Sequence, residues 1–326
     1  MAYDTGYTSW FKMANEATWG TKVEPTGTDD DDVLLLDSTG DMSETQNITQ
    51  EPATGTRKAQ CLSKGNYGAS GSLSGKLQGG RLIAYALGDD AVTSAAGLTT
   101  HTMTPIDTTD IPSFTLRKGH INTAKGQDAV GCKISDFSIN LAVGGQLTGS
   151  FNWMGKQIDQ VTTSPGTRDT LSTDCVLPSY TGTVSWNSNA IEASAFTFNY
   201  NNTLGGDEYS LSDRRRKVIT QGMIDMNGTF TLVFSDFTVY DDFQTTWSTG
   251  IEVGTARALT FTADNGGATT AERELSATMA DAELSEVGNP IALDEKRVTQ
   301  EYTFIPKTLT NIIYKDEIAT DYILGV

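Results

Sequence analysis

Apolar and polar residues alternate along residues 132–156 in the way expected of a β-hairpin. The apolar residues fall at even positions up to Ile134 and at odd positions from Phe137 onward. A one-residue change of register moves every following side chain to the opposite face of a strand. The pattern therefore predicts a strand with a β-bulge at Ser135 and Asp136, followed by a turn and a return strand.

Residues 277–307 repeat this pattern with different amino acids. Their apolar positions change phase between Met279 and Ala282, so a second β-bulge is expected at Ala280 and Asp281. One constant spacing relates the outgoing strands of the two segments, and a slightly larger spacing relates the return strands. The chain is therefore predicted to be a tandem duplication in which the second hairpin has the longer tip.

A further pair of segments, residues 65–86 and 222–243, corresponds without a gap. Gly71 corresponds to Gly228, and both glycines stand in an alternating strand pattern. Each segment then changes to helical spacing of its apolar residues, and Gly88 is a natural end for the first helix. We expect each helix to cover one face of its sheet.

The predicted duplication divides the chain into five parts. An acidic run, Asp29–Asp32, precedes the first copy, and Ser164-Pro165-Gly166 marks a linker between the copies. The apolar residues near the C-terminus predict a docked segment. The predicted parts are an N-terminal arm (residues 1–32), tube domain copy 1 (33–156), a linker (157–176), tube domain copy 2 (177–307) and a C-terminal docking segment (308–326).

Composition supports a mainly β protein and argues against a tight DNA binder. The 326 residues include 32 glycines, and the strand-like segments are rich in Ser and Thr. The net charge is −18, whereas proteins that grip phosphates need clustered Lys and Arg. Ordinary solubility or a salty habitat also explains such acidity. The three cysteines have no metal-like spacing, and we expect neither a signal peptide nor a membrane span.

The sequence contains no pattern typical of an enzyme. His101 and His120 are the only histidines, and polar sequence separates them. The motifs GxxxxGK[ST] and HExxH do not occur, and acidic pairs such as Asp89-Asp90 and Asp241-Asp242 are common on surfaces. We therefore assign no catalytic, cofactor-binding or metal-binding residue, and we expect no cofactor.

The run Arg214-Arg215-Arg216-Lys217 allows two interpretations. Clustered cations are typical of nucleic-acid binding. In an acidic chain they are also suited to a carboxylate surface on a neighbouring subunit, which is the interpretation we favour.

Several longer segments resemble the tail tube proteins of long-tailed, siphovirus-like phages and archaeal viruses. The segments are EATWGTKVEP (residues 16–25), LPSYTGTVSWNSNAIEASAFTFNYNN (177–202), RRRKVITQGMIDMNGTFTLVF (214–234), ELSATMADAEL (274–284) and RVTQEYTFIPK (297–307). Together they span nearly the whole chain. The acidic run Asp29–Asp32 lies outside the pattern of the family.

The resemblance implies a β-sandwich or barrel-like tube domain with a flanking helix and a long hairpin. It implies rings of six such domains that stack into a hollow conduit for viral DNA. A duplicated member would form a pseudo-sixfold ring from three chains. The implied partners are further copies of the chain, the tail terminator, the tape measure and the distal tail protein. DNA would pass without specific binding, and the protein would be located in the virus tail and, during assembly, in the host cytoplasm.

Two expectations join this resemblance to the residues. We expect the acidic charge to face the channel, because an acidic wall repels phosphates over about 8 Å at physiological salt. We also expect the hairpin at residues 134–153 to drive polymerisation, because long strands with unpaired edges can be completed by neighbouring subunits.

Two other classes of function stay open at this point. A soluble carbohydrate-binding or adhesin-like module would stack sugars on exposed tryptophans, for which Trp153, Trp186 and Trp247 are the candidates. Their apolar surroundings favour packing instead. A tail terminator or a capsid decoration protein would keep the fold and change the assembly.

Overall fold

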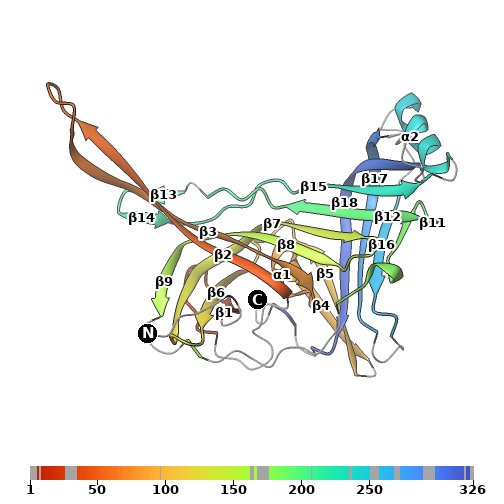
Figure 1. Ribbon diagram of the computed structural model, residues 1–326, viewed down its shortest axis with the longest axis horizontal. Coiled ribbons are helices and arrows are strands. Elements are labelled where there is room, and N and C mark those ends of the chain that lie inside the picture. Colours follow the sequence, from red (N-terminus) through yellow and green to blue (C-terminus); the bar gives the residue numbers. More distant parts are fainter. Residues whose placement is uncertain are drawn as a thin grey trace.

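The computed structural model shows a mainly β, antiparallel, sandwich-like protein (Figure 1). It describes residues 6, 9–25, 35–95, 97–161, 165–166, 176–206, 208–234, 237–249, 257–267, 272–288, 298–318 and 321–323. The predicted fold class is confirmed in that part of the chain. The predicted acidic run at residues 29–32 lies outside the described residues.

The described residues of the first half of the chain form one α-helix and nine strands. These are β1 (Ser9–Glu16), β2 (Leu35–Pro52), β3 (Ala59–Leu77), α1 (Arg81–Leu87), β4 (Gly88–Ala95), β5 (Leu98–Pro105), β6 (Ser113–His120), β7 (Lys125–Ala142), β8 (Thr148–Gly155) and β9 (Gln157–Val161).

The second half contains the remaining elements. These are a 3-10 turn (Ser179–Thr181), β10 (Thr183–Trp186), β11 (Asn189–Ile191), β12 (Ala193–Asn201), β13 (Tyr209–Ser210), β14 (Asp213–Arg216), β15 (Asp225–Val233), α2 (Thr238–Thr249), β16 (Leu259–Asp264), β17 (Glu274–Gly288) and β18 (Thr299–Asp316). No helix in the described part of the chain is long and apolar enough to cross a membrane.

Two sets of five strands have the same spatial order. The first set runs β2-β3-β8-β7-β6 and the second runs β12-β15-β18-β17-β16. In each set the helix follows the second strand of that order, α1 after β3 and α2 after β15. The sets join where β7 of the first pairs with β12 of the second (Figure 1). This repeated order supports the predicted duplication, and the domain boundaries stay a prediction.

A glycine beneath an aromatic ring occurs at the same place in both sets. Gly71 of β3 lies opposite Trp153 of β8, and Gly228 of β15 lies opposite Phe304 of β18. A Cβ atom at Gly71 would come within 2.4 Å of the Trp153 ring, and one at Gly228 within 2.3 Å of the Phe304 ring. Only glycine leaves room for the ring to lie flat on the neighbouring strand. The structure thus confirms the correspondences, inferred from sequence, of Gly71 with Gly228 and of Trp153 with Phe304.

The structure confirms the bulge predicted in β7. The register between β7 and β8 shifts between Ile134 and Asp136, and the buried positions change from even to odd there. This shift lets one long strand turn its apolar side toward the core along its whole length.

In β17 the buried positions change phase at Ala280 and Asp281, as predicted, and Asp281 has a positive φ of 52°. The pairing with β18 differs from the prediction, however. Leu284 lies opposite Phe304, whereas the spacing of the return strands places Gln300 there. Strand β17 is therefore displaced along β18, with register shifts at Thr278/Met279 and at Leu284/Glu286.

The projecting hairpin is β2–β3 and not the predicted segment at residues 134–153. The β2–β3 hairpin leaves the body of the molecule as a long arm (Figure 1), and residues 44–64 are nearly all exposed. Strands β7 and β8 instead lie inside the sheet, where β7 pairs with β6, β8, β9 and β12. The expected unpaired edges of the 134–153 hairpin are therefore absent from β7, which has strand partners on both sides, and a role of this hairpin in polymerisation stays a prediction.

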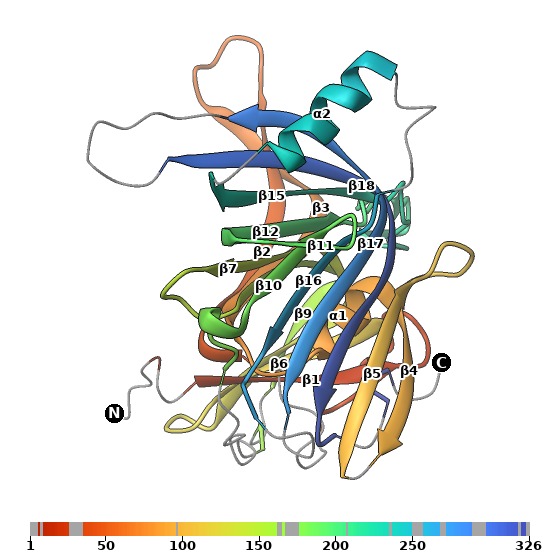
Figure 2. The same ribbon diagram turned by 90° about the vertical axis from the view of Figure 1, so that its right-hand side faces the viewer.

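The two helices differ in their burial. All residues of α1 are buried, and the helix ends at Gly88, whose φ is 104° and whose N–H donates to the carbonyl of Ala84. The predicted end at Gly88 is confirmed. Helix α2 packs beside β17 at the far end of the molecule (Figure 2), with Val239 buried and Phe237 54% exposed.

A buried charged network holds the C-terminal residues against β4 and β5. His101 of β5 is fully buried, with Nδ1 2.8 Å from Asp90 Oδ2 and Nε2 3.3 Å from Asp316 Oδ1. The ring of Tyr322 stacks on His101 at 3.8 Å, and its hydroxyl donates to Asp316. Burial alone would lower the pKa of His101, but hydrogen bonds to Asp316 and Asp90 raise it to about 9. Burial raises the pKa of Tyr322.

We predict that the protein loses stability as pH rises from about 6.5 to about 9. The folded-state pKa of His101 lies above its ordinary value of 6.5, so the stabilisation is complete below pH 6.5 and disappears through pH 9. A shift of this size corresponds to about 3 kcal/mol. Urea unfolding at several pH values measures the change. His101→Gln should flatten the slope and His120→Gln should keep it; equal slopes in all three proteins would contradict the assignment.

Candidate subunit interface

The joint between β7 and β12 makes the two sets one sheet. Seven consecutive residue pairs link the strands, from Ala142 opposite Ala195 to Asp136 opposite Asn201. On the core side Ile139 lies opposite Phe198, and the next pairs bring aromatic rings together. The joint therefore has both the backbone pairing and the packed apolar face of a domain interior.

Asn202 fixes the end of this joint. Its backbone N–H donates to the carbonyl of Ser135 at 2.8 Å, at the bulge of β7. Its side-chain amide donates to the carbonyls of Ala86 at 2.9 Å and Ile134 at 3.0 Å. One buried side chain thus binds β12, the bulge and the last turn of α1 together, and satisfies carbonyls that the bulge and the helix end leave free.

The face of the sheet opposite the core carries mostly small polar side chains, and a neighbouring row on the same face includes the carboxylates Asp41, Asp136 and Asp225. They form rows that cross both sets and the joint between them. One row is Thr39, Ser74, Ser150, Ser138, Asn199 and Asn227, and a second is Thr148, Asn140, Thr197, Thr229 and Thr303. These side chains are exposed or half-buried, so this face is left open by the described part of the chain.

The two margins of the joined sheet have edges without a strand partner among the described residues. Strand β2 pairs with β3 alone. Strand β17 pairs with β18 along its length but with β16 only over Glu274–Met279. Beyond that, the N–H of Ala282 donates to the carbonyl of Arg257, and no described strand continues along this edge. Such edges expose backbone donors and acceptors and are ready to pair with another chain.

The arginine run binds its own chain. Arg216 donates to the carbonyls of Ala69 at 2.7 Å and Gly155 at 2.8 Å, and Arg214 donates to that of Gly65 at 2.7 Å. The β13–β14 loop is thereby fastened across the base of the β2–β3 hairpin. The interpretation that the run meets a carboxylate surface of a neighbouring subunit was wrong for these two arginines, since backbone carbonyls of the first set hold them.

The EATWGTKVEP segment packs against β6 and β7. The carboxylate of Glu16 is buried and accepts four hydrogen bonds, from the N–H groups of Gly20 and Gly131 and the hydroxyls of Ser113 and Thr115, at 2.7–3.0 Å. Residues 9–16 of the predicted arm also pair with β6. This part of the N-terminal region is therefore built into the body of the protein.

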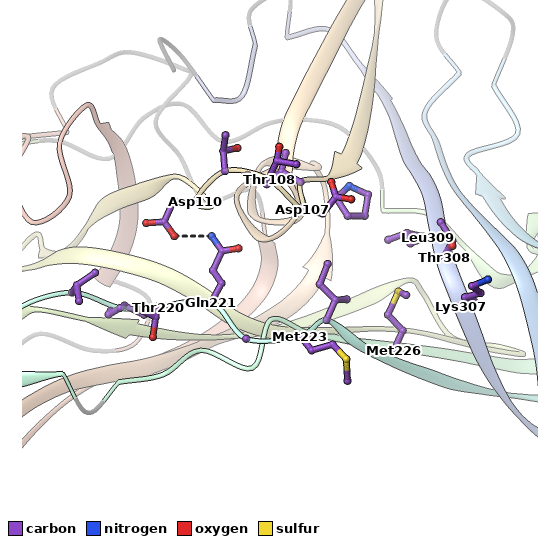
Figure 3. A pocket seen from close by; sticks show the side chains of 17 residues that line it. Asp107, Thr108, Asp110, Thr220, Gln221, Met223, Met226, Lys307, Thr308 and Leu309 are labelled. Carbon is purple, nitrogen blue, oxygen red and sulfur yellow. Dashed lines mark hydrogen bonds between the residues drawn. The ribbon is translucent and has the colours of Figure 1, made fainter.

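A cavity of about 790 Å³ lies where a loop of the first half meets the second half of the chain (Figure 3). The β5–β6 loop, the β14–β15 loop and β18 line it. Asp110 accepts a hydrogen bond from Gln221 at 2.9 Å and forms an ion pair with the buried Lys133 at 2.9 Å. Lys133 also donates to the carbonyl of Ile219. These contacts connect the β5–β6 loop and β7 to the β14–β15 loop. Within the described ranges no group of three His, Cys, Asp or Glu side chains is placed to hold a metal ion.

The candidate residues for chemistry lie in separate structural networks. His101 belongs to the C-terminal network, whereas Nδ1 of His120 lies 2.9 Å from the hydroxyl of Ser9. In the acidic pairs, Asp90 binds His101 and Asp242 accepts a hydrogen bond from Trp186 at 2.8 Å. Cys132 is buried, and burial raises the pKa of its thiol, whereas Cys61 is exposed.

The tryptophans proposed for sugar stacking are buried where the structure describes them. Trp153 is 1% exposed and Trp186 is 2% exposed. The side chain of Trp247 lies outside the described residues. The carbohydrate-binding interpretation therefore has no support from Trp153 or Trp186.

A family model described as phage tail tube protein matches residues 9–305. The chain belongs to this family, and its role is that of a structural component of the virus tail. A search of curated proteins found no match.

We predict that Glu16→Ala lowers the free energy of unfolding by about 3–5 kcal/mol, because four buried or half-buried donors lose their acceptor. Glu16→Gln keeps one carbonyl oxygen and should lose less. Urea unfolding measures both, and Glu24→Ala, at a side chain that is 61% exposed, is the control. A loss for Glu16→Ala no larger than that of the control would contradict the role given to this carboxylate.

Proposed function

We propose that the protein is the ring-forming subunit of a virus tail tube, with three chains per ring and rings stacked into a hollow conduit for viral DNA. The observation that carries the proposal is the joined sheet, which contains the same strand order twice and is open at both margins. Contacts between two different edges form a closed ring when the rotation between neighbours closes. Three chains with two strand sets each give six similar units.

The polar face of the sheet, opposite the core, would line the channel. The rows of Ser, Thr and Asn offer hydroxyl and amide groups to water and no cluster of cations to DNA phosphates. Asp41, Asp136 and Asp225 lie on the same face, in keeping with the acidic wall expected from the net charge of −18. DNA would pass because this face presents no cluster of cations to its phosphates and its carboxylates repel them.

The β2–β3 hairpin would connect neighbouring rings. Ile48 and Leu62 are 57% and 64% exposed, and the pairing of Ile48 with Lys64 and of Gln50 with Leu62 puts both apolar side chains on one face of the hairpin. Exposed apolar residues on a projecting element are typical of a protein contact. The tail terminator, the tape measure and the distal tail protein would bind the ends and the interior of the tube. We propose no enzymatic role.

Electron microscopy of the concentrated full-length protein tests the proposal. We expect hollow tubes or stacked rings, with mass measurement giving three chains per ring. Single rings that never stack would indicate a terminator, which keeps the fold and caps the tube. A chain that stays monomeric at all concentrations would contradict the tube and the ring together.

We predict that the double variant Ile48→Asp, Leu62→Asp forms rings but few tubes. Two charges on the apolar face of the hairpin would have to be desolvated in a ring-to-ring contact, which is costly. Both side chains are exposed in the single chain, so the thermal unfolding temperature should stay the same. Ile121→Asp, at another exposed apolar residue, is the matched control. Tubes of normal length from the double variant would show that the hairpin does not connect rings.

A further inference from the structure

The connection between β12 and β15 has the same place in the second set as the β2–β3 hairpin has in the first. Met42 lies opposite Gly71 in β2–β3, as Phe198 lies opposite Gly228 in β12–β15. Met42 and Phe198 are 156 positions apart in the sequence, and Gly71 and Gly228 are 157 positions apart. The second connection is therefore longer than the first by a single residue.

The two connections have different shapes in spite of their similar lengths. In the first set the pairing of β2 with β3 continues outward to Pro52 opposite Ala59, which makes the projecting hairpin (Figure 1). In the second set the regular pairing of β12 with β15 ends at Asn201 opposite Asp225. The chain turns there, with a positive φ of 45° at Thr203, and continues into the β13–β14 loop. One set extends its connection, and the other folds it back.

Arg216 holds the folded connection at the end of a strand pair. The pairing of β3 with β8 ends at Ala69 opposite Gly155, and beyond this pair β2 is the strand partner of β3 among the described residues. Nη1 of Arg216 donates to both carbonyls, at 2.7 Å to Ala69 and 2.8 Å to Gly155. Its Nε donates to the carbonyl of Gly206, in the same connection, at 2.7 Å. The guanidinium group therefore closes the ladder at the point where the hairpin leaves the sheet.

Arg214 makes the next contact outward along β3. Its Nε donates to the carbonyl of Gly65 at 2.7 Å. The register of β2–β3 shifts at this place, because two residues of β3, Gly65 and Asn66, face the single residue Asn47 of β2. An extra residue of this kind bends a strand pair. Arg214 thus fastens the bulge from which the outer part of the hairpin starts.

The projecting hairpin lacks the residue that makes most of these contacts. At the spacing of the return strands, Arg57 corresponds to Arg214, but Ala59 corresponds to Arg216. Ala59 has no side-chain group that could donate to a carbonyl. The connection with both arginines is fastened to the sheet, and the connection with one of them projects.

We propose that the β13–β14 loop is a folded counterpart of the projecting hairpin and acts as its brace. Arg214 and Arg216 are the positioning residues, and they fix the direction in which the hairpin leaves the sheet. Each chain then presents one hairpin of fixed direction in place of two. The brace is a property of the single chain, and its use in stacking rings rests on the proposed function. A hairpin held in one direction loses less conformational freedom when it binds another ring.

Distance measurements between two spin labels on the full-length single chain test the brace. One label is attached to Cys61, which is exposed on the hairpin. The other is attached through Lys125→Cys, at an exposed residue where β7 begins. Cys132 is buried, and Cys175 is replaced by Ser. Double electron–electron resonance gives the distribution of distances between the labels.

The test variant is Arg214→Ala with Arg216→Ala. The matched control is Arg57→Ala with Lys58→Ala, which removes the same number of positive charges from exposed side chains of the hairpin. Arg216→Lys is the milder second variant, because an ammonium group donates hydrogen bonds but lacks the planar fork that reaches several carbonyls. Circular dichroism shows whether each variant folds.

We expect one narrow distribution in the labelled protein and in the control, and a distribution at least about two-fold broader in the double variant. Arg216→Lys should lie between them. A labelled protein as broad as the double variant, or a double variant as narrow as the control, would overturn the brace. If the double variant does not fold, an Arg216→Lys distribution as narrow as that of the control overturns it instead. Because single chains are measured, an absence of tubes in the microscope would overturn the proposed function alone.

Discussion

The structure depends on how the backbone groups at the edges of its strands find hydrogen-bond partners. A backbone N–H or C=O group at a sheet margin has to find a partner or stay in water. The chain satisfies this need for β7 by laying β12 beside it, and Asn202 completes the joint where the regular pairing stops. Together with the pairing of β18 with β5 and the contacts of Arg216, this line of hydrogen bonds positions the second half against the first.

The same joint shows how the two faces of the sheet differ: one is apolar and packed, and the other is polar. On one face Phe196 stacks on Phe261 at 4.3 Å and joins the sheet to the layer that covers it. On the other face the side chains are mostly short and hydrophilic, and they continue in rows past the boundary between the two halves. Alternation along each strand produces both faces at once, because successive residues point in opposite directions. A smooth polar surface and a packed core are therefore products of a single pattern.

The sequence predicted the features that depend on local patterns. Alternation and its change of phase located the bulge at Ser135 and the correspondence of Gly71 with Gly228, because both follow from the period of a strand. Composition correctly indicated a mainly β fold. The end of α1 at Gly88 was predictable for the same reason, since a left-handed residue ends a helix in a recognisable way.

Features that depend on distant contacts were not predictable. No local sequence pattern indicates that Arg216 binds the carbonyls of Ala69 and Gly155. A cationic run in an acidic chain favoured a carboxylate surface on a neighbouring subunit instead. The identity of the projecting hairpin was missed because strand length does not reveal which strands lie inside a sheet. The displacement of β17 along β18 was hidden as well, since a slip by an even number of residues preserves the alternation of faces.

Strand β7 has one further consequence, because it joins the two sets. It pairs with β8 on one side and with β12 on the other, so loss of either neighbour would leave an edge of β7 without its strand partner. The covalent connection also holds β7 and β12 at a high effective concentration, independent of how much protein is present. In the proposed ring, half of the joints between strand sets would form inside each chain as it folds, and the other half would form only when chains meet.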